Sequence, residues 1–198
     1  AGKKANALSH PVVLDPVGAG ASTLRTKTAL DLLEQVHFAV IRGNISEIKT
    51  LAQGSGKTRG VDADLSDVVT EDNLEAAAAF AKEVAARFDS VVAITGAIDL
   101  VADKERCFVI RNGRPEMGKI TGTGCQLSGL TAAFVTANPE HALEAAAAAV
   151  VTMGLAGELA FQRLEEGEGN SSYRSRIIDA IYHMDGKQLM EGARYEVR

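Results

Sequence analysis

Short apolar segments alternate with helical patterns along the first half of the chain. Apolar runs at residues 11–14, 38–41 and 91–94 have the length of buried strands. Between them, apolar residues recur at helical spacing, as in the segment after Ser22, a residue type that caps helix N-termini. Further helices are predicted at 46–51 and 70–88. Buried strands that alternate with helices are typical of a parallel α/β sheet.

The second half of the chain predicts a β-hairpin and long helices. Apolar runs at 100–102 and 107–110 flank the charged segment 103–106, which is the pattern of a hairpin. Helices are predicted directly after 121–125, from 139 to about 164, and at 174–184. The segment 53–67 is rich in Gly, Ser, Lys and Asp and predicts an exposed loop. Because no repeat or linker divides the chain, we expect residues 1–198 to form a single domain.

Composition narrows the class of protein. The 198 residues are 46% hydrophobic and 24% charged, which is typical of a globular chain and excludes a disordered or collagen-like one. The two cysteines, Cys107 and Cys125, form no C-x-x-C pair, which excludes a disulfide framework and a thiolate zinc site. A net charge of −5 without a basic stripe argues against nucleic acid as a partner. The most apolar stretch, 145–157, is shorter than the ~20 residues that cross a bilayer, so we expect a cytoplasmic protein without a membrane partner.

Polar or glycine-rich turns follow three of the predicted strands, at 15–18, 42–44 and 95–96. In open α/β sheets, ligands bind in the crevice beyond the carboxyl ends of the strands. Gly, Asp and Asn also close strands for local reasons, so one such turn alone indicates little. Three of them together favour a binding site at that edge of the sheet.

A second candidate site is the segment 121–125, directly before a predicted helix. Gly122 and Gly124 allow the backbone to approach a ligand, and the free N–H groups of a helix start form an anion hole suited to a phosphoryl group in transfer. A helix N-terminus also favours the thiolate of a cysteine, which makes Cys125 a candidate general base. The alternative is a small cysteine buried at a tight helix start.

Asn44 and Glu47 lie one helical turn apart, so an amide and a carboxylate can face one point. Together with Asp15, Glu47 would supply two carboxylates for a hydrated Mg²⁺ that keeps positions open for phosphate oxygens. In the alternative interpretation, Glu47 only caps backbone N–H groups at a helix start.

Two glycine-rich segments resemble nucleotide-binding motifs but lack a required residue. The segment 54–58 ends like a P-loop, yet Leu51 stands where that motif needs glycine. The segment 18–20 begins like a dinucleotide fingerprint, yet Thr23 stands where that fingerprint needs Gly or Ala. We expect neither motif to be functional.

Taken together, the segments 15–21, 42–47, 94–96 and 121–125 resemble, in order and register, the motifs of the bacterial hydroxyethylthiazole kinase family. This family belongs to the ribokinase-like superfamily, and the resemblance extends from about residue 11 to about residue 163. It implies a three-layer α/β fold with a mostly parallel central sheet flanked by helices. It also implies phosphorylation of the primary alcohol of 4-methyl-5-(2-hydroxyethyl)thiazole by ATP, in a homotrimer whose active site lies at the subunit interface.

The resemblance implies roles for the residues around the second candidate site. Cys125 occupies the general-base position, where most ribokinase-like relatives have Asp. Gly122 and Gly124 lie in the anion hole, and Gly122 also falls where the family contacts the thiazole.

It further implies roles at the strand ends. Arg42 and Thr95 match positions that contact ATP. Asp15 and Glu47 match the acidic pair around Mg²⁺ and phosphate, and Asn44, which we also place with the ATP contacts, completes the Asn-x-x-Glu motif of the superfamily.

This sequence departs from the family at its front, because members carry a further N-terminal stretch that supplies the first βα units and part of the thiazole pocket. Two rival interpretations remain. The first is another member of the superfamily, either a small-alcohol kinase such as the hydroxymethylpyrimidine type or a related dehydratase. The second is a non-catalytic nucleotide-binding subunit. Cys125 argues against the first, whose members usually have Asp there. The joint presence of the expected site residues argues against the second.

Overall fold

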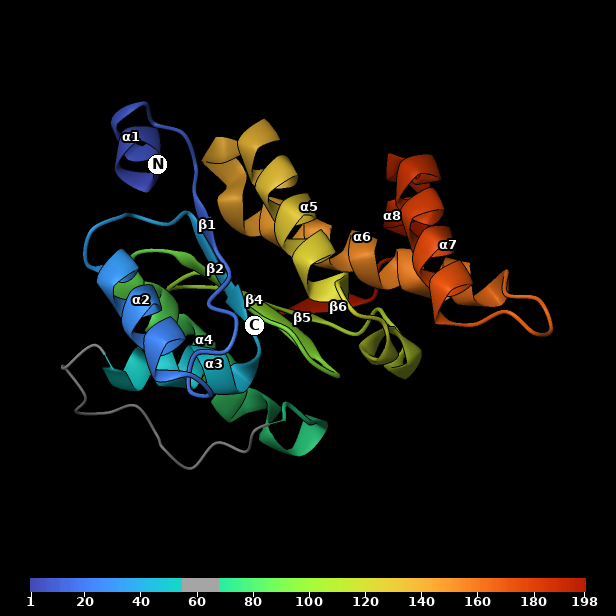
Figure 1. Ribbon diagram of the computed structural model, residues 1–198, viewed down its shortest axis with the longest axis horizontal. Helices are drawn as coiled ribbons and strands as arrows, with labels where there is room; N and C mark the ends of the chain where they lie inside the picture. Colours follow the sequence, from blue (N-terminus) through green and yellow to red (C-terminus); the bar gives the residue numbers. More distant parts are fainter. Residues whose placement is uncertain (55–67) are drawn as a thin grey trace.

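The computed structural model describes residues 1–54 and 68–198 (Figure 1). Its centre is a sheet with the strand order β1-β2-β3-β4-β5-β6. The strands have these bounds: β1 Val13–Leu14, β2 Val40–Gly43, β3 Val91–Ile94, β4 Asp99–Ala102, β5 Cys107–Ile110 and β6 Tyr195–Val197. Most of the predicted loop 53–67, and all but the first residue of the P-loop-like segment 54–58, lie outside the described residues.

The sheet is mixed. The pairs β1–β2 and β2–β3 are parallel, whereas β3–β4, β4–β5 and β5–β6 are antiparallel. The α/β class is therefore confirmed, but the expectation of a mostly parallel sheet holds only for β1 to β3. Only residues 95–98 and 103–106 join the antiparallel strands β3, β4 and β5, and connections this short cannot make the crossover that a parallel pair needs.

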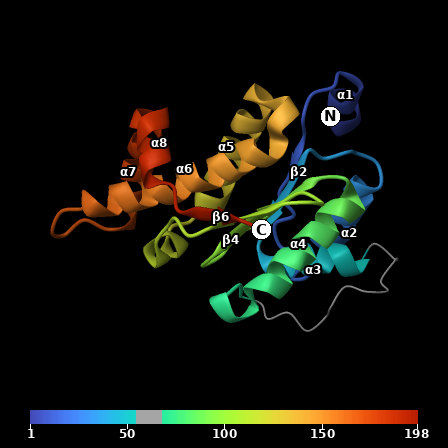
Figure 2. The same cartoon turned by 180° about the vertical axis from the view of Figure 1, so that it is seen from behind.

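Helices cover both faces of the sheet (Figures 1 and 2). On one face lie α2 (Thr23–Leu33), α3 (Ile45–Gly54) and α4 (Leu74–Phe88). On the other lie α5 (Thr123–Ala137) and α6 (Ala142–Gln162), against which α7 (Asn170–His183) and α8 (Gly186–Gly192) pack. The expected three layers are thus confirmed.

Alternate residues of the strands point into two separate apolar cores. Ile41 and Val92 belong to the core under α3 and α4, while their neighbours Val40 and Val91 belong to the core under α6. This follows from the two-residue period of a strand. Strands buried on both faces explain why the sequence shows continuous apolar runs there instead of alternation.

Most predicted elements are present, with shifted bounds. The hairpin β4–β5 and the Ser22 cap of α2 are confirmed, since the Ser22 side chain accepts from the N–H of Arg25. The predicted strand 38–41 begins two residues later, so that Arg42 and Gly43 belong to β2 instead of the turn after it. The helix α5 begins at Thr123, which places Gly124 and Cys125 inside its first turn.

Two elements at the end of the chain carried no recognisable sequence signal. The helix α8 is only seven residues long, and β6 is a three-residue strand that pairs with β5. Such short segments lack a full period of any pattern, and β6 exists only because β5 offers it an edge.

The helix α6 is longer than the apolar stretch read from the sequence. Residues Pro139–Gln162 are long and apolar enough to cross a membrane by length and composition alone. However, 72% of the most apolar 18-residue window in this range is buried inside the fold, against the sheet and the neighbouring helices. Its apolar residues therefore form part of the core under α6.

Candidate active site

Three residues from neighbouring parallel strands meet at the carboxyl edge of the sheet. Nη2 of Arg42, on β2, donates to Oγ1 of Thr95 at 2.8 Å, directly after β3. Nη1 of Arg42 donates to Oδ2 of Asp15 at 3.3 Å, directly after β1. The ends of parallel strands lie at one edge of a sheet, which is why residues so distant in sequence come together.

This cluster is nearly enclosed but not fully satisfied. The side chains of Arg42 and Asp15 are only 13% and 17% exposed. Nε of Arg42 and Oδ1 of Asp15 are buried and have no hydrogen-bond partner within 1–54 and 68–198. Buried polar atoms without partners are costly, so their presence at the mouth of a crevice is typical of a ligand site.

Ser128 ties the helix α5 to this cluster. Its Oγ donates to Oδ2 of Asp15 at 2.5 Å and lies 3.1 Å from the carbonyl oxygen of Gly124, one turn earlier. Sequence reasoning missed Ser128, because a serine inside a helix gives no signal unless the partner of its hydroxyl is known. The bond fixes the start of α5 beside the ends of β1 and β2.

The two glycines of the segment 121–125, Gly122 and Gly124, are required for different structural reasons. Gly122 is the N-cap of α5 with φ +99°, a left-handed conformation that favours glycine. At Gly124, a Cβ would lie 3.0 Å from Nη1 of Arg42, so the missing side chain lets the guanidinium approach the helix. The structure thus brings the free N–H groups of a helix start and the half-buried guanidinium of Arg42 to one place.

Cys125 lies in the first turn of α5 and is exposed. The interpretation of a small cysteine buried at a helix start is therefore wrong. Cys107 is the buried one, on β5, where burial raises the pKa of its thiol to about 11. Of the two cysteines, Cys125 is therefore the one with an accessible thiol.

Asn44 and Glu47 form a reciprocal cap at the start of α3. Oδ1 of Asn44 accepts from the N–H of Glu47 at 2.8 Å, and Oε2 of Glu47 accepts from the N–H of Asn44 at 2.9 Å. Oε1 of Glu47 also accepts from the N–H of Gly18 at 2.9 Å, which ties the β1–α2 loop to this turn. The capping role of Glu47 is thus confirmed by its hydrogen bonds. Both of its carboxylate oxygens still have lone pairs for a further partner.

A divalent metal fits the residues present only with help from water and phosphate. Within the described ranges, no group of three or more His, Cys, Asp or Glu side chains could hold an ion. Mg²⁺ keeps several of its waters and takes one or two carboxylates plus phosphate oxygens. The unpartnered Oδ1 of Asp15 and the spare lone pairs of Glu47 suit such a hydrated ion.

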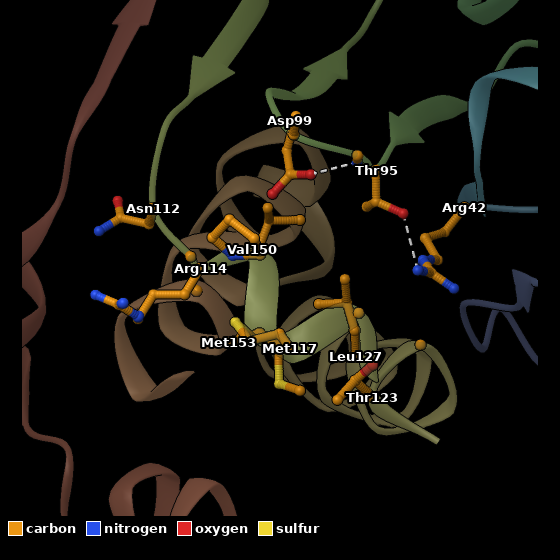
Figure 3. A pocket seen from close by; sticks show the side chains of 17 residues that line it. Arg42, Thr95, Asp99, Asn112, Arg114, Met117, Thr123, Leu127, Val150 and Met153 are labelled. Carbon is orange, nitrogen blue, oxygen red and sulfur yellow. Dashed lines mark hydrogen bonds between the residues drawn. The ribbon is translucent and has the colours of Figure 1, made fainter. Parts of the chain in front are cut away.

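A cavity of about 510 Å³ opens beside Arg42 and Thr95 (Figure 3). Polar side chains at its rim include Asp99, Asn112 and Arg114, and its apolar walls include Leu127, Val150 and Met153. Apolar walls with a few polar groups are typical of a small-molecule site. Because the cluster at Arg42 forms one end of this cavity, a ligand can reach both.

The wall opposite Arg42 is fixed by the far end of the chain. The N–H of Gly113 (φ +113°) donates to Oε1 of Glu158 on α6 at 2.6 Å. Arg194 forms a bidentate pair with the same carboxylate, at 2.7 and 2.9 Å, and its own N–H donates to Oδ1 of Asn112 at 2.8 Å. Sequence reasoning missed this wall, because partners about 80 residues apart leave no local signal.

Asp99 was also missed, although it lies just four residues after Thr95. Its Oδ1 accepts from the N–H of Gly96 at 2.8 Å, which closes the β3–β4 turn. Burial raises the pKa of this carboxyl to about 7, and the Gly96 bond and the charge of Arg42 offset only part of that rise. A sequence signal existed, because Asp commonly accepts from a backbone N–H of its own turn.

Comparison with solved structures first supports the class of fold, a ribokinase-like α/β fold. The structure of the pyridoxal kinase from Staphylococcus aureus superposes with a TM-score of 0.52 at 15% identity, covering 99% of this chain and 67% of that one. At this identity the likeness concerns the fold alone.

The family follows from closer comparisons. The model of the hydroxyethylthiazole kinase family matches residues 1–187. A hydroxyethylthiazole kinase of Clostridium acetobutylicum is 57% identical over 196 residues, which are 99% of this chain and 72% of that relative. The structure of the hydroxyethylthiazole kinase from Pyrococcus horikoshii has a TM-score of 0.84 at 33% identity, covering 100% and 69% of the two chains. The chain therefore belongs to the hydroxyethylthiazole kinase family, as its motifs predicted.

Proposed function

We propose that this protein transfers the γ-phosphoryl group of ATP to the primary alcohol of 4-methyl-5-(2-hydroxyethyl)thiazole, a step of thiamine salvage. One observation carries the proposal: the start of α5 lies against a half-buried, incompletely satisfied cluster of Asp15, Arg42 and Thr95. Membership of the family supports the choice of alcohol.

Arg42 and Thr95 bind the phosphates of ATP in this proposal. The guanidinium is planar and offers several donors, which suits phosphate oxygens, and its buried Nε still lacks a partner. Thr95 holds one arm of that guanidinium in place. The cavity beside them takes the nucleoside, since its walls combine apolar surface with a few polar groups.

The start of α5 stabilises the charge that develops during transfer. Free N–H groups around Gly122 and Gly124 face the anionic phosphoryl oxygens. The thiolate form of Cys125, exposed at the same turn, accepts the proton of the alcohol and becomes a thiol. The alcohol oxygen bonds to the γ-phosphorus while the bond between that phosphorus and the leaving ADP breaks. The exposed thiol supports approach of the alcohol from the outer side, away from the nucleotide cavity.

Asp15 and Glu47 hold a hydrated Mg²⁺ in this proposal, and Asn44 orients Glu47 through their reciprocal bonds. Such an ion offsets phosphate charge and orients the phosphoryl group. The carboxylates themselves keep Arg42 and the β1–α2 loop in place.

We also propose that residues 1–198 fold as one domain, that the protein is cytoplasmic, and that it works as a homotrimer with the site at the subunit interface. The exposure of Cys125 at the start of α5 supports a second subunit that covers the place where the alcohol would bind. Native mass spectrometry tests the trimer, and a monomer that is fully active would exclude it.

The function is tested by incubating the purified protein with ATP, Mg²⁺ and the thiazole alcohol. We expect ADP release that depends on the alcohol, and a product heavier by one phosphoryl group in mass spectrometry. The hydroxymethylpyrimidine alcohol in place of the thiazole serves as the specificity control. ATP binding without ADP release would favour a non-catalytic subunit, and preference for the pyrimidine would favour the other small-alcohol kinase.

A further inference from the structure

Asp99 is a half-buried residue at the nucleotide cavity, and the proposed transfer does not use its carboxyl group. It begins β4, and Figure 3 shows one of its oxygens bonded to the backbone beside Thr95. Through the N–H of Gly96 it fixes the turn that carries Thr95, which in turn holds Arg42. A substitution at Asp99 can therefore shift Arg42 through two hydrogen bonds, the one to Gly96 and the one between Thr95 and Arg42.

The charges around Asp99 are few. Of the described residues that line the cavity, only Arg42 on β2 and Arg114 before the short turn Pro115–Lys119 are cationic, while α5 and α6 supply uncharged side chains. The guanidinium of Arg114 donates to both oxygens of Glu116 at 3.1 and 3.2 Å and lies 3.9 Å from the centre of the Phe161 ring. Arg42 is thus the cation that offsets an ionised Asp99.

A nucleotide and an ionised Asp99 compete for this cation. Phosphates bound at Arg42 add several negative charges near a carboxyl that burial already disfavours in its ionised form. Arg42 is also shared with Asp15, so it cannot offset all of them. Neutralisation of Asp99 removes the repulsion and keeps the Gly96 bond, because a protonated carboxyl still has an acceptor oxygen.

We propose, on the basis of the proposed function, that Asp99 is a positioning residue for the nucleotide that holds the Thr95 turn and takes up one proton when the phosphates bind at Arg42. Nucleotide affinity then falls as the pH rises through the titration of Asp99. The sign follows from linkage, since a form that binds one more proton is favoured at lower pH.

The test compares wild type with Asp99→Asn, whose amide oxygen still accepts from Gly96 but carries no charge. The dissociation constant of ATP is measured from pH 6 to 8.5, with a nucleotide displacement assay. In wild type it should rise by about tenfold per pH unit above the titration of Asp99, and it should stay flatter in the variant. At pH 8 we expect Asp99→Asn to bind ATP about tenfold more tightly than wild type, and equally well at pH 6.

Two controls isolate Asp99. The phosphates of ATP titrate identically for both proteins, so the difference between the profiles belongs to Asp99. Asp103→Asn changes a carboxylate at the other end of the same strand, which caps the β4–β5 turn, and it should keep the wild-type profile. Asp99→Ala removes both the charge and the acceptor, so it should bind ATP more weakly than Asp99→Asn at every pH.

Calorimetry in two buffers of different protonation enthalpy measures the proton uptake directly. At pH 8, wild type should take up close to one proton more per ATP bound than Asp99→Asn. Equal uptake and parallel pH profiles would overturn the role of Asp99 even where wild type phosphorylates the thiazole alcohol. Failure of wild type to release ADP would overturn the proposed function, while the binding experiments would still decide the role of Asp99.

Discussion

The two ends of the cavity are built in opposite ways. At one end, which we propose binds the phosphates and call the phosphate end, Asp15, Arg42 and Thr95 come from the ends of adjacent parallel strands. Hydrogen bonds from Arg42 join the three residues. At the far end, Asn112 and Gly113 are held by Glu158 and Arg194, from a later helix and the end of the chain. The first end carries unsatisfied buried groups, whereas the second is densely paired.

This difference indicates that one end of the cavity takes part in the reaction, whereas the other only shapes the cavity. Groups left without partners, such as Nε of Arg42, are available to a ligand, while fully paired groups such as the Glu158 carboxylate can only support the wall. Substitutions at the phosphate end should therefore change turnover and nucleotide binding strongly. Those at the far end should change the fit of the nucleotide, with less effect on the chemical step.

The largest effect is expected from Cys125, at the phosphate end. Cys125→Ala or Cys125→Ser removes the proposed base and should lower kcat by roughly 10²–10⁴-fold, the usual worth of general base catalysis. ATP affinity should change little. Cys125→Asp restores a base of the type used by most of the superfamily, and it should keep substantial activity with a rising pH–rate limb moved to lower pH. If the alanine variant turns over like the parent, catalysis rests on positioning and the anion hole alone.

Arg42→Ala should raise the KM for ATP or lower kcat by about 10–100-fold, because it removes charged hydrogen bonds worth about 1.5–3 kcal/mol. It also leaves the Asp15 carboxylate partly buried with Ser128 as its remaining side-chain partner. The KM of the thiazole alcohol should stay nearly constant, and steady-state kinetics measure both. An unaltered ATP profile would remove Arg42 from the site.

Gly124→Ala tests the contact between helix and guanidinium directly. A Cβ at 3.0 Å from Nη1 must displace Arg42, so we expect about a tenfold rise in the KM for ATP, equivalent to about 1.4 kcal/mol. Gly129→Ala lies in the same helix with nothing near its Cβ position, and it is the matched control. Equal KM values for the two variants would show that the close approach is unimportant.

Glu47→Gln keeps the shape of the cap but removes the charge proposed to hold Mg²⁺. Activity should fall several-fold, and the Mg²⁺ concentration for half-maximal activity should rise. Asp15→Asn should do the same with a larger loss, because Asp15 also pairs with Arg42. An unchanged metal dependence in Glu47→Gln would leave capping as its sole role.

Glu158→Gln tests the far end of the cavity and should have the smallest effect on kcat of these variants. It weakens the bonds to Gly113 and Arg194, so the KM for ATP should rise a few-fold with kcat nearly unchanged. The half-buried position of the carboxylate should also cost about 1–3 kcal/mol of unfolding free energy, measured by denaturant titration. A fall in kcat as large as that of Arg42→Ala would show that the two ends are not separable.

The sequence by itself determined the α/β class, the hairpin, and the residues of the phosphate end. Strand ends and helix starts use local chemistry, such as the reciprocal bonds of Asn44 and Glu47, and local chemistry is visible at fixed short spacings. Only the tertiary structure decided the antiparallel pairing of β3 with β4 and of β5 with β6, the bond of Ser128 to Asp15, and the wall made by Glu158 and Arg194. These features join residues tens of positions apart, and folding alone brings such partners into contact. The raised pKa of Asp99, about 7, likewise depends on the tertiary structure, because desolvation depends on everything packed around a carboxyl and not on its neighbours in sequence.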